Sequence, residues 1–240
     1  IRHRSPSRGL GDVYKRQPMH WGHKQLGIIS MGSPVGVTLP KAAGVALASK
    51  IRGDGAVTIV YFGEGAASEG DAHEGMAFAG VHQLPVVFFC NNNGWATSVP
   101  ANLQSAGSNV AARAQAYGFP GVVVDGCDPL EVYKVTKEAV VRARSGGGPT
   151  LIEAKTLRLL PHSSSDDHAR YRSQEELDAE RLQDPLPRFR DYLLSRGLIG
   201  ADQEAELREA ISHEVEEAIA FAEAAPVPDP RTAVEGIYAP

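Results

Sequence analysis

Between Pro40 and Thr156, short apolar runs alternate with segments of helical pattern, and this alternation constrains the fold more than any other feature. The strand-like runs are VTIVYF, VVFFC, GVVVD and TLIEAKT. The helical patterns lie near residues 41–51, 69–82, 107–117 and 128–145. Apolar strands separated by helices are typical of a parallel sheet that is covered on both faces. The sequence therefore predicts an α/β fold with a doubly wound parallel sheet.

The chain after Thr156 has a different pattern. A polar loop leads into helices that we expect near 173–183, 185–196 and 202–225, and a Pro-rich extended tail follows over 226–240. The last helix carries an apolar stripe, which indicates packing either on the domain or on a partner. The stripe consists of Leu207, Ile211, Val215, Ala218, Ile219 and Ala222. We expect an α/β domain over 18–172, followed by the helical extension over 173–225.

Composition excludes several classes of protein. The net charge of −5 and the dispersed basic residues predict no nucleic-acid partner. Cys90 and Cys127 each follow an apolar run, which favours small buried side chains over a disulfide or a metal pair, as in a reducing bacterial cytoplasm. No apolar run approaches the roughly 20 residues that span a bilayer. We therefore expect a cytoplasmic protein that does not enter a membrane.

The triplet Gly-acid-Gly occurs twice, around Asp54 and around Glu64, and the strand order separates the two copies. Ligands of open parallel sheets bind outside the carboxyl ends of the strands. Asp54 precedes the strand VTIVYF, where Gly-Asp-Gly makes a turn between a helix and a strand. Glu64 follows that strand and leads into the small residues Gly65 and Ala66, which let a ligand approach the backbone. Glu64 is therefore the candidate site residue.

The next strand, VVFFC, ends in Asn91-Asn92-Asn93-Gly94-Trp95. Consecutive parallel strands usually lie near each other, so we expect both carboxyl ends to face one point. A carboxylate, an amide oxygen and a backbone carbonyl are hard oxygen ligands, and Mg²⁺ completes its octahedron with water and phosphate oxygens. The pattern predicts a site for Mg²⁺ and a diphosphate.

The pairing of Gly63-Glu64-Gly65 with Asn92-Asn93 resembles the thiamine diphosphate fingerprint, with glutamate in place of the usual aspartate. The segments YFGEGAASEGDAHEG, PVVFFCNNNGWATS and HSSSDDHARYRS together resemble the alpha subunits of branched-chain 2-oxoacid dehydrogenases. The resemblance runs from about Pro18 to the C-terminus. It leaves 1–17 outside the family, as a segment similar to translated adaptor sequence, and it implies that an N-terminal part of the domain is missing.

The resemblance assigns roles to individual residues. It implies that Glu64 and Asn93 bind Mg²⁺ through side chains and Trp95 through its carbonyl. Gly65 and Ala66 are expected to give backbone N–H groups to the diphosphate. Ser33 and Val35, in ISMGSPVGVTLP, align with residues that line the cofactor. Two departures weaken other contacts: Asn91 replaces an arginine of mammalian relatives, and Val37 and Thr38 differ from potassium-loop residues, so no potassium site is expected.

The loop after the last strand contains His162. A surface loop is the simpler interpretation of its composition, whereas the resemblance implies a catalytic histidine that contacts the cofactor. Imidazole suits proton donation because its ordinary pKa lies near neutrality. Ser163 and Ser173 match serines that are phosphorylated in mitochondrial relatives. We expect Tyr171 and Arg172 to order this loop, with Asp166 or Asp167 as the partner of Arg172.

The implied activity is oxidative decarboxylation of a branched-chain 2-oxoacid, with acyl transfer to a lipoyl group. The implied partners are a beta subunit, in an alpha2beta2 assembly, and a lipoyl-bearing acyltransferase core. Because the cofactor of such enzymes lies between the two subunits, we expect this chain alone to bind it weakly and to decarboxylate nothing. The alternatives are a pyruvate dehydrogenase alpha subunit, a Mg²⁺-dependent phosphoryl-transfer enzyme, and an inactive assembly fragment.

Overall fold

The computed structural model describes residues 22–107, 109–227 and 229–231. The segment 1–17 and most of the tail 226–240 lie outside these ranges. The described chain divides into two compact units, Pro34–Asp191 and a second unit that combines residues up to Ser33 with those from Tyr192 onward. The unit 34–191 contains the sheet and is described first.

The sheet has four parallel strands in the order β1-β2-β6-β5. The bounds of these strands are β1 Thr58–Gly63, β2 Val86–Asn92, β5 Gly121–Asp125 and β6 Thr150–Lys155. Gly63 pairs with Asn91, and Asn92 pairs with Lys155, so the carboxyl ends lie at one edge of the sheet. These strands match the four apolar runs and confirm the predicted parallel sheet.

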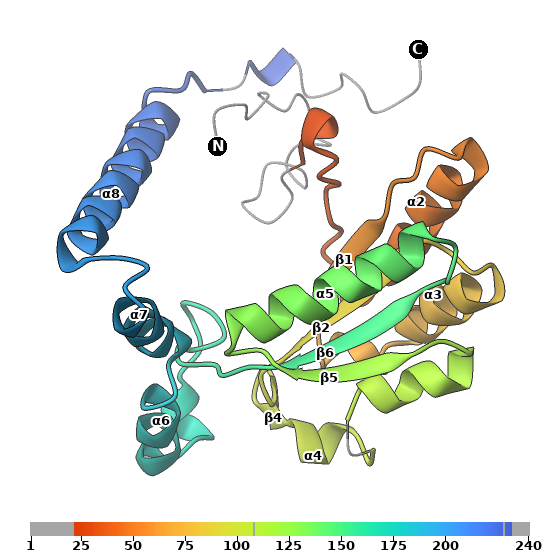
Figure 1. Cartoon of the computed structure of the whole chain (residues 1–240), viewed down its shortest axis with the longest axis horizontal. Helices are drawn as coiled ribbons and strands as arrows, with labels where there is room; N and C mark the ends of the chain where they lie inside the picture. Colours follow the sequence, from red (N-terminus) through yellow and green to blue (C-terminus); the bar gives the residue numbers. More distant parts are fainter. Residues whose placement is uncertain (1–21, 108, 228, 232–240) are drawn as a thin grey trace. The chain divides into compact units, whose positions relative to one another are not determined.

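Helices cover both faces of this sheet (Figure 1). The helices α2 (Thr38–Arg52) and α3 (Gly70–Val81) lie on one face, and α5 (Pro129–Arg144) lies on the other. The topology explains this placement, because β1 to β2 and β5 to β6 run in opposite directions along the sheet. Right-handed crossovers in opposite directions place their helices on opposite faces. The sheet is therefore doubly wound, as the sequence predicts.

A separate hydrophobic cluster fills each face. The larger cluster contains Leu39, Met76, Leu84 and Phe88, all fully buried. The smaller cluster, under α5, is built around Val87 and Ile152. Val87 and Phe88 are consecutive in β2 and belong to different clusters, as the period of two in a strand requires.

The local sequence explains where the helices begin and end. Gly53 ends α2 in a left-handed conformation with φ of 65°, and its N–H donates to the Ser49 and Lys50 carbonyls. Asp128 caps α5 by accepting from the N–H groups of Leu130 and Glu131, with Pro129 in the first turn. A side-chain cap and a glycine stop thus fix these boundaries locally.

One predicted helix differs from the observed element in type and in length. The pattern near 107–117 favours an α-helix, whereas the structure has a 3₁₀ helix, η4, over Ala111–Tyr117. Two side chains fix its start: Glu153 Oε2 accepts from the Ala111 N–H, and Asn109 Oδ1 accepts from the Ala112 N–H, both at 2.7 Å. Tertiary contacts therefore shorten the predicted helix to a single 3₁₀ segment.

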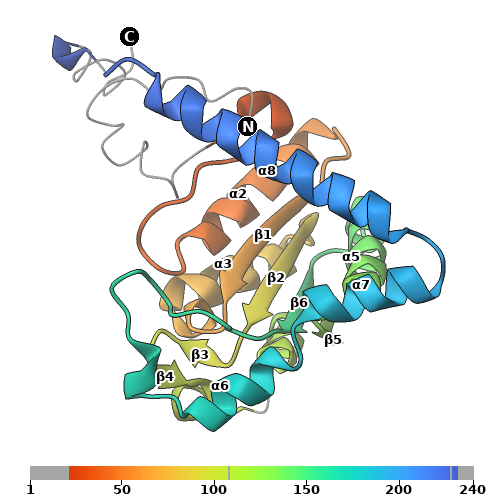
Figure 2. The same cartoon turned by 90° about the vertical axis from the view of Figure 1, so that its left-hand side faces the viewer.

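The remaining elements of this unit follow the strand ends. The 3₁₀ helix η3 (Ala66–Ser68) follows β1, and a small antiparallel pair, β3 (Trp95–Ala96) with β4 (Val99–Pro100), follows β2. A short helix, α4 (Ala101–Gln104), comes next, and η5 (His168–Arg170) and α6 (Gln174–Arg181) follow β6. Figure 2 shows β3 and β4 beyond the arrowheads of β1 and β2.

The second unit contains η2 (Lys24–Leu26) and α8 (Ala201–Glu223), and α7 (Pro185–Ser195) crosses the division. The division between the compact units lies at 191/192, after α6, and the domain boundary at 172/173 stays a prediction. Arg172 joins α6 to the preceding loop through ion pairs with Glu176 and Glu180 at 2.9 and 2.7 Å. Among the described residues, no helix combines the length and apolar character needed to cross a membrane.

Candidate functional site

Glu64 lies directly after β1 at the carboxyl edge of the sheet. The residue is only 5% exposed. Its Oε1 atom is buried and has no hydrogen-bond partner among the described residues. Burying a carboxylate oxygen without a partner is costly, and a water, an ion or another bound group at this position would offset the cost. This atom is the strongest sign of a ligand position in the unit.

The other triplet has an ordinary structural role. Asp54 lies at the opposite edge of the sheet, where its carboxylate accepts from the Ala56 N–H at 3.0 Å and pairs with Arg52 at 3.0 Å. The Ala56 hydrogen bond and the Arg52 guanidinium lower the pKa of Asp54. These contacts confirm that Asp54 belongs to a turn between α2 and β1.

The loop after β1 lies against the segment that follows β2. The Gly65 carbonyl accepts from Gln104 Nε2 at 3.1 Å. A Cβ atom on Gly65 would lie 3.0 Å from the Ala96 Cβ atom, so a side chain at this position would crowd the neighbouring segment. Ala66, which opens η3, is buried. Glu64, Gly65 and Ala66 thus form one compact loop beside β3.

Asn93 and Trp95 are neighbours in the turn that follows β2. The Trp95 N–H donates to Asn93 Oδ1 at 3.1 Å. An amide oxygen has two lone pairs, so Asn93 Oδ1 keeps acceptor capacity beyond this bond. Gly63 pairs with Asn91 across β1 and β2, which places this turn beside the Glu64 loop. The structure brings the two predicted strand ends together.

The predicted residues Val35 and Ser33 fall in different units. Val35 is exposed, and its neighbour Gly36 has a φ of 89°. A Cβ atom on Gly36 would lie 2.8 Å from the Glu69 Cβ atom, so Val35 lies on a segment packed against the end of the Glu64 loop. Ser33 belongs to the other unit, and its role stays a prediction.

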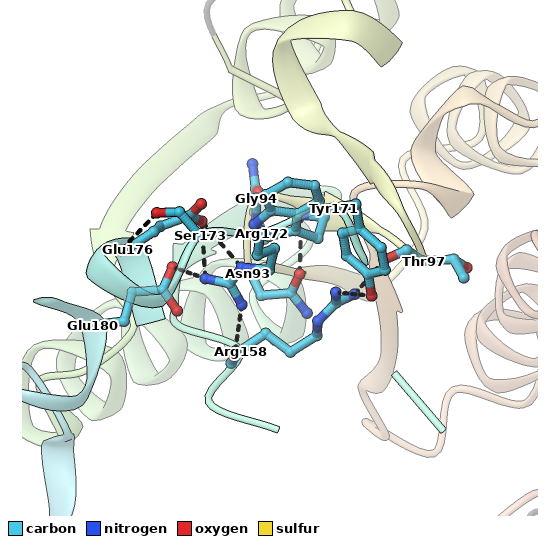
Figure 3. A network of polar contacts seen from close by, with 11 residues as sticks. Asn93, Gly94, Thr97, Arg158, Tyr171, Arg172, Ser173, Glu176 and Glu180 are labelled. Atoms are coloured by element: carbon cyan, nitrogen blue, oxygen red, sulfur yellow. Dashed lines mark hydrogen bonds and ion pairs between the residues drawn. The ribbon is translucent and has the colours of Figure 1, made fainter. Parts of the chain in front are cut away.

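The polar network of Figure 3 includes two buried arginines, Arg158 and Arg172, and both guanidinium groups lie near the Trp95 ring. The guanidinium carbons of Arg158 and Arg172 lie 5.9 and 5.2 Å from the Trp95 ring centroid. The Tyr171 ring lies 5.4 Å from the same ring, centroid to centroid. Arg158 also donates to the Thr97 carbonyl at 2.7 Å and to the Tyr171 hydroxyl at 2.8 Å. Cation–π contacts therefore anchor the Trp95 ring and with it the backbone at that position.

Asp166 connects the His162 loop to this cluster. Its Oδ2 atom accepts from the Tyr171 hydroxyl at 2.6 Å and from the His162 N–H at 2.8 Å. The Tyr171 hydroxyl and the His162 N–H hold the pKa of Asp166 below its usual value. The His162 side chain is exposed, whereas its backbone is fixed by Asp166. Tyr171 orders the loop, as the sequence predicts.

The predicted partner of Arg172 is wrong. Arg172 pairs with Glu176 and Glu180 of α6 rather than with Asp166 or Asp167, and it donates to the Arg158 carbonyl at 2.8 Å. Asp166 is engaged by Tyr171, and Asp167 caps η5 by accepting from the Ala169 N–H at 3.2 Å. The carboxylates on the following helix are therefore the ones that reach the guanidinium.

The two predicted regulatory serines have different surroundings. Ser173 is the N-cap of α6, where its hydroxyl accepts from the Glu176 N–H at 3.1 Å. Ser163 is exposed and lies 3.2 Å from the Ser165 hydroxyl, oxygen to oxygen. Phosphorylation of either serine stays a prediction.

Glu153 is a buried acid, hydrogen-bonded to Asn92, that the sequence analysis missed. It lies fully buried in the middle of β6. Burial raises its pKa, but hydrogen bonds from Lys155, the Ala111 N–H and Asn92 outweigh this effect and lower the pKa below its ordinary value. The available signal was an acid, Glu153, between the apolar residues Ile152 and Ala154 in the middle of a predicted strand.

The remaining candidates for metal or redox chemistry are structural. Cys90 and Cys127 are buried free thiols, and burial raises the pKa of both. Within the ranges that the structure describes, no group of three or more His, Cys, Asp or Glu side chains could hold a metal ion. Any cation at the strand ends would therefore use amide or carbonyl oxygens beside Glu64.

The parallel sheet and the polar loops at its carboxyl edge define an α/β protein of the class that binds ligands outside its strand ends. The sequence allows a closer assignment. Residues 3–231 match the family model described as "Dehydrogenase E1 component", and the chain belongs to this family. The matched range includes most of 1–17, whose assignment as a foreign segment stays a prediction.

Curated relatives share much of this sequence. The 2-oxoisovalerate dehydrogenase subunit alpha of Bacillus subtilis is 45% identical over 225 residues, which cover 94% of this chain and 68% of the relative. The human mitochondrial 2-oxoisovalerate dehydrogenase subunit alpha is 43% identical over 225 residues, with 93% and 51% covered. The 3-methyl-2-oxobutanoate dehydrogenase subunit alpha of Mycobacterium tuberculosis is 49% identical over 168 residues, with 70% and 46% covered. The chain thus spans about half to two thirds of the length of these relatives.

Proposed function

We propose that the strand-end loops of this chain bind Mg²⁺ and the diphosphate of thiamine diphosphate. The buried Oε1 atom of Glu64, which lacks a protein partner among the described residues, carries this proposal. A cation would satisfy this oxygen and offset the cost of burying the carboxylate. Membership of the E1 family supports thiamine diphosphate as the cofactor.

The residues present fit such a ligand. Glu64 and Asn93 would bind the cation through side-chain oxygens, and Trp95 through its backbone carbonyl. This set mixes one carboxylate with neutral oxygens, which suits Mg²⁺ that keeps water and phosphate ligands. The backbone N–H groups of Gly65 and Ala66, in the loop directly after Glu64, would donate to the diphosphate. The Arg158–Trp95–Arg172 cluster would hold the Trp95 carbonyl in place.

Other residues of the chain would serve the reacting part of the ligand. Ser33 and Val35 would line the cofactor, and the exposed His162 imidazole would hold or donate a proton at a ring nitrogen. Asp166 and Tyr171 fix the backbone beside His162, so the ring would be presented from an ordered loop. When bound, thiamine diphosphate supplies the electron sink for decarboxylation of a 2-oxoacid.

We further propose that the chain acts as the alpha subunit of a branched-chain 2-oxoacid dehydrogenase. The names of its relatives specify 2-oxoisovalerate or 3-methyl-2-oxobutanoate, which favours a branched-chain substrate over pyruvate. The words "subunit alpha" in those names support a beta subunit as partner. Acyl transfer to a lipoyl group on an acyltransferase core would follow. Ser163 and Ser173 would be positions where phosphorylation regulates this activity.

The test is decarboxylation by the assembled enzyme. The chain is combined with a beta subunit of the same family, Mg²⁺ and thiamine diphosphate, and carbon dioxide release is compared for 2-oxoisovalerate and pyruvate. We expect release to require both subunits and to be faster with 2-oxoisovalerate. A preference for pyruvate would contradict the branched-chain assignment. No decarboxylation by an assembly that binds the cofactor would favour the interpretation as an inactive assembly fragment.

A further inference from the structure

Glu153 is not among the proposed cation or cofactor residues, yet its buried carboxylate holds the turn that contains Asn93. Its Oε1 atom accepts from Asn92 Nδ2 at 2.6 Å, and its Oε2 atom accepts from the Ala111 N–H at 2.7 Å. Lys155 forms an ion pair with the same carboxylate. Asn92 is itself 5% exposed, so the Glu153–Asn92 contact is shielded from water.

This contact fixes which way the Asn92 amide faces. An ionised carboxylate only accepts hydrogen bonds, so Asn92 must turn its NH₂ group toward Glu153. The Asn92 Oδ1 atom is then left to accept from the Gly94 N–H, at 3.0 Å. Gly94 has a φ of 82°, which shows that the chain turns sharply there. The orientation of one amide thus determines the turn that contains Asn93 and leads to Trp95.

The second oxygen of Glu153 connects the same site to the Glu64 loop. Ala111 begins η4, and Arg113 in that helix donates to the Ala67 carbonyl, three residues after Glu64. Arg113 also donates to Ser105 Oγ at 3.0 Å. Glu153 therefore holds the Asn93 turn with one oxygen and, through η4, the Glu64 loop with the other.

We infer that Glu153 is a positioning residue: by fixing the Asn92 amide and the start of η4, it sets Asn93 and Trp95 opposite Glu64 for cation binding. The inference rests on the proposed function, because the cation is part of that proposal. Hydrogen-bond partners that orient metal sites typically change metal affinity by about 10–100-fold when they are altered. We expect an effect in this range.

Exchanging the two polar partners tests this inference. In Glu153→Gln, the new amide keeps an acceptor for the Ala111 N–H but turns an NH₂ group toward the NH₂ group of Asn92. Either the two donors clash, or Asn92 flips and loses its bond from the Gly94 N–H. In Asn92→Asp, two carboxylates face each other. In the double variant Glu153→Gln/Asn92→Asp, the introduced glutamine donates to the introduced aspartate, which still accepts from the Gly94 N–H. Lys155, which pairs with Glu153 Oε1 in the wild type, takes the introduced aspartate as its new partner.

Three measurements are made on each variant: Mg²⁺-dependent binding of thiamine diphosphate by calorimetry, hydrogen exchange of the Gly94 amide without cofactor, and the melting temperature. We expect each single variant to bind the cofactor about tenfold or more weakly and to expose the Gly94 amide, by disturbing the orientation of the site. We expect the double variant to recover both properties, because its donors and acceptors match again.

Ile152→Val is the matched control. Ile152 precedes Glu153 in β6, and its side chain packs in the cluster on the opposite face of the sheet. This variant should lower the melting temperature while leaving the affinity and the Gly94 exchange unchanged. If affinity follows the melting temperature across all four variants, the role of Glu153 is only structural and the inference is overturned.

The outcomes also separate this inference from the proposed function. If the wild-type chain, with its beta subunit, binds no thiamine diphosphate in the presence of Mg²⁺, the proposed function fails and the positioning role fails with it. If the wild-type protein binds and Glu153→Gln binds equally well, only the inference fails. If the double variant recovers the wild-type melting temperature but not the affinity, the inference also fails.

Discussion

At the scale of single residues, position on the sheet distinguishes two chemically similar acids. Asp54 is satisfied by Ala56 and Arg52 in a turn at the amino edge. Glu64 is buried at the carboxyl edge with an oxygen that has no partner in the described part of the chain. A satisfied carboxylate stabilises its own loop, whereas an unsatisfied one costs stability until a ligand binds.

The comparison of Asp54 with Glu64 gives a direct prediction. Glu64→Ala should abolish Mg²⁺-dependent binding of thiamine diphosphate, because the cation loses its only carboxylate ligand, whereas Asp54→Ala should leave binding nearly unchanged. Calorimetric titration of both variants measures this difference. Without cofactor, the isosteric Glu64→Gln variant should melt within a few degrees of the wild type, because Oε1 has no hydrogen-bond partner in the described chain that the substitution could remove. Equal loss of binding in the Asp54 and Glu64 variants would contradict the assignment.

His162 allows a second prediction at this scale. His162→Ala should lower the turnover of the assembled enzyme much more than it lowers the melting temperature. The side chain is exposed and adds little burial, and the backbone N–H that bonds to Asp166 remains in the variant. Turnover and thermal unfolding are measured on the same preparation. A melting temperature that falls in step with turnover would show that the histidine is structural.

At the scale of elements, the proposed site consists of loops that follow three neighbouring strands, β1, β2 and β6, at one edge of the sheet. The loop after β6 depends on a small number of side chains, Arg158, Tyr171 and Arg172, for its order. Because these groups are polar and are held by mutual contacts, the shape of the loop depends on the protonation of its carboxylates.

Asp166 provides the corresponding prediction. The pKa of Asp166 is lower in the folded chain than the ordinary Asp value of about 3.9. Asp166 therefore contributes fully to loop order above the ordinary pKa. This contribution is lost as the pH falls through the lower pKa of the folded chain. Tyr171→Phe removes the largest cause of the lowering. The midpoint for Asp166 should therefore rise toward the ordinary value, and the loop should open at a higher pH than in the wild type.

Carbon NMR titration of the Asp166 carboxyl group measures this midpoint, and hydrogen exchange of the His162 amide reports the opening of the loop. Phe189→Leu, in α7, serves as a control for loss of an aromatic group elsewhere. An unchanged Asp166 midpoint in Tyr171→Phe would show that the tyrosine does not order the loop.

At the scale of the whole molecule, apolar burial is uneven between the two units. The sheet carries two buried clusters, whereas the stripe on α8 is largely exposed, with Leu207, Ile211, Val215 and Ile219 between 50% and 60% exposed. From the sequence alone, this stripe is expected to pack either on the domain or on a partner. Within its own unit this stripe is an exposed apolar surface, as either kind of packing requires.

Two Leu→Ala variants test this difference in the isolated chain. Leu84 is fully buried in the larger cluster, so Leu84→Ala should lower the free energy of unfolding by about 2–5 kcal/mol. Leu207 is 60% exposed, so Leu207→Ala should stay within about 0.5 kcal/mol of the wild type. Denaturant unfolding measures both values. Equal losses would show that the α8 stripe packs within the chain.

The sequence alone determined the strands and their parallel direction, and it predicted Glu64 rather than Asp54 as a site residue. These features follow from local periodicity and from the rule that ligands bind at carboxyl strand ends, which need no knowledge of distant contacts. The family resemblance added the roles of Asn93, Trp95 and His162. The register of β1 and β2 then placed the first two residues beside Glu64, as expected.

The tertiary structure alone decided the partners of the polar side chains. Asn92 and Glu153 are 61 residues apart in sequence, and no local pattern predicts that the carboxylate orients the amide. The same holds for Arg172, which pairs with Glu180 rather than with the nearer Asp166, and for η4, whose start is fixed by Glu153. Hydrogen bonds and ion pairs depend on atoms that meet only after the sheet has formed, whereas hydrophobic periodicity is already present in the chain.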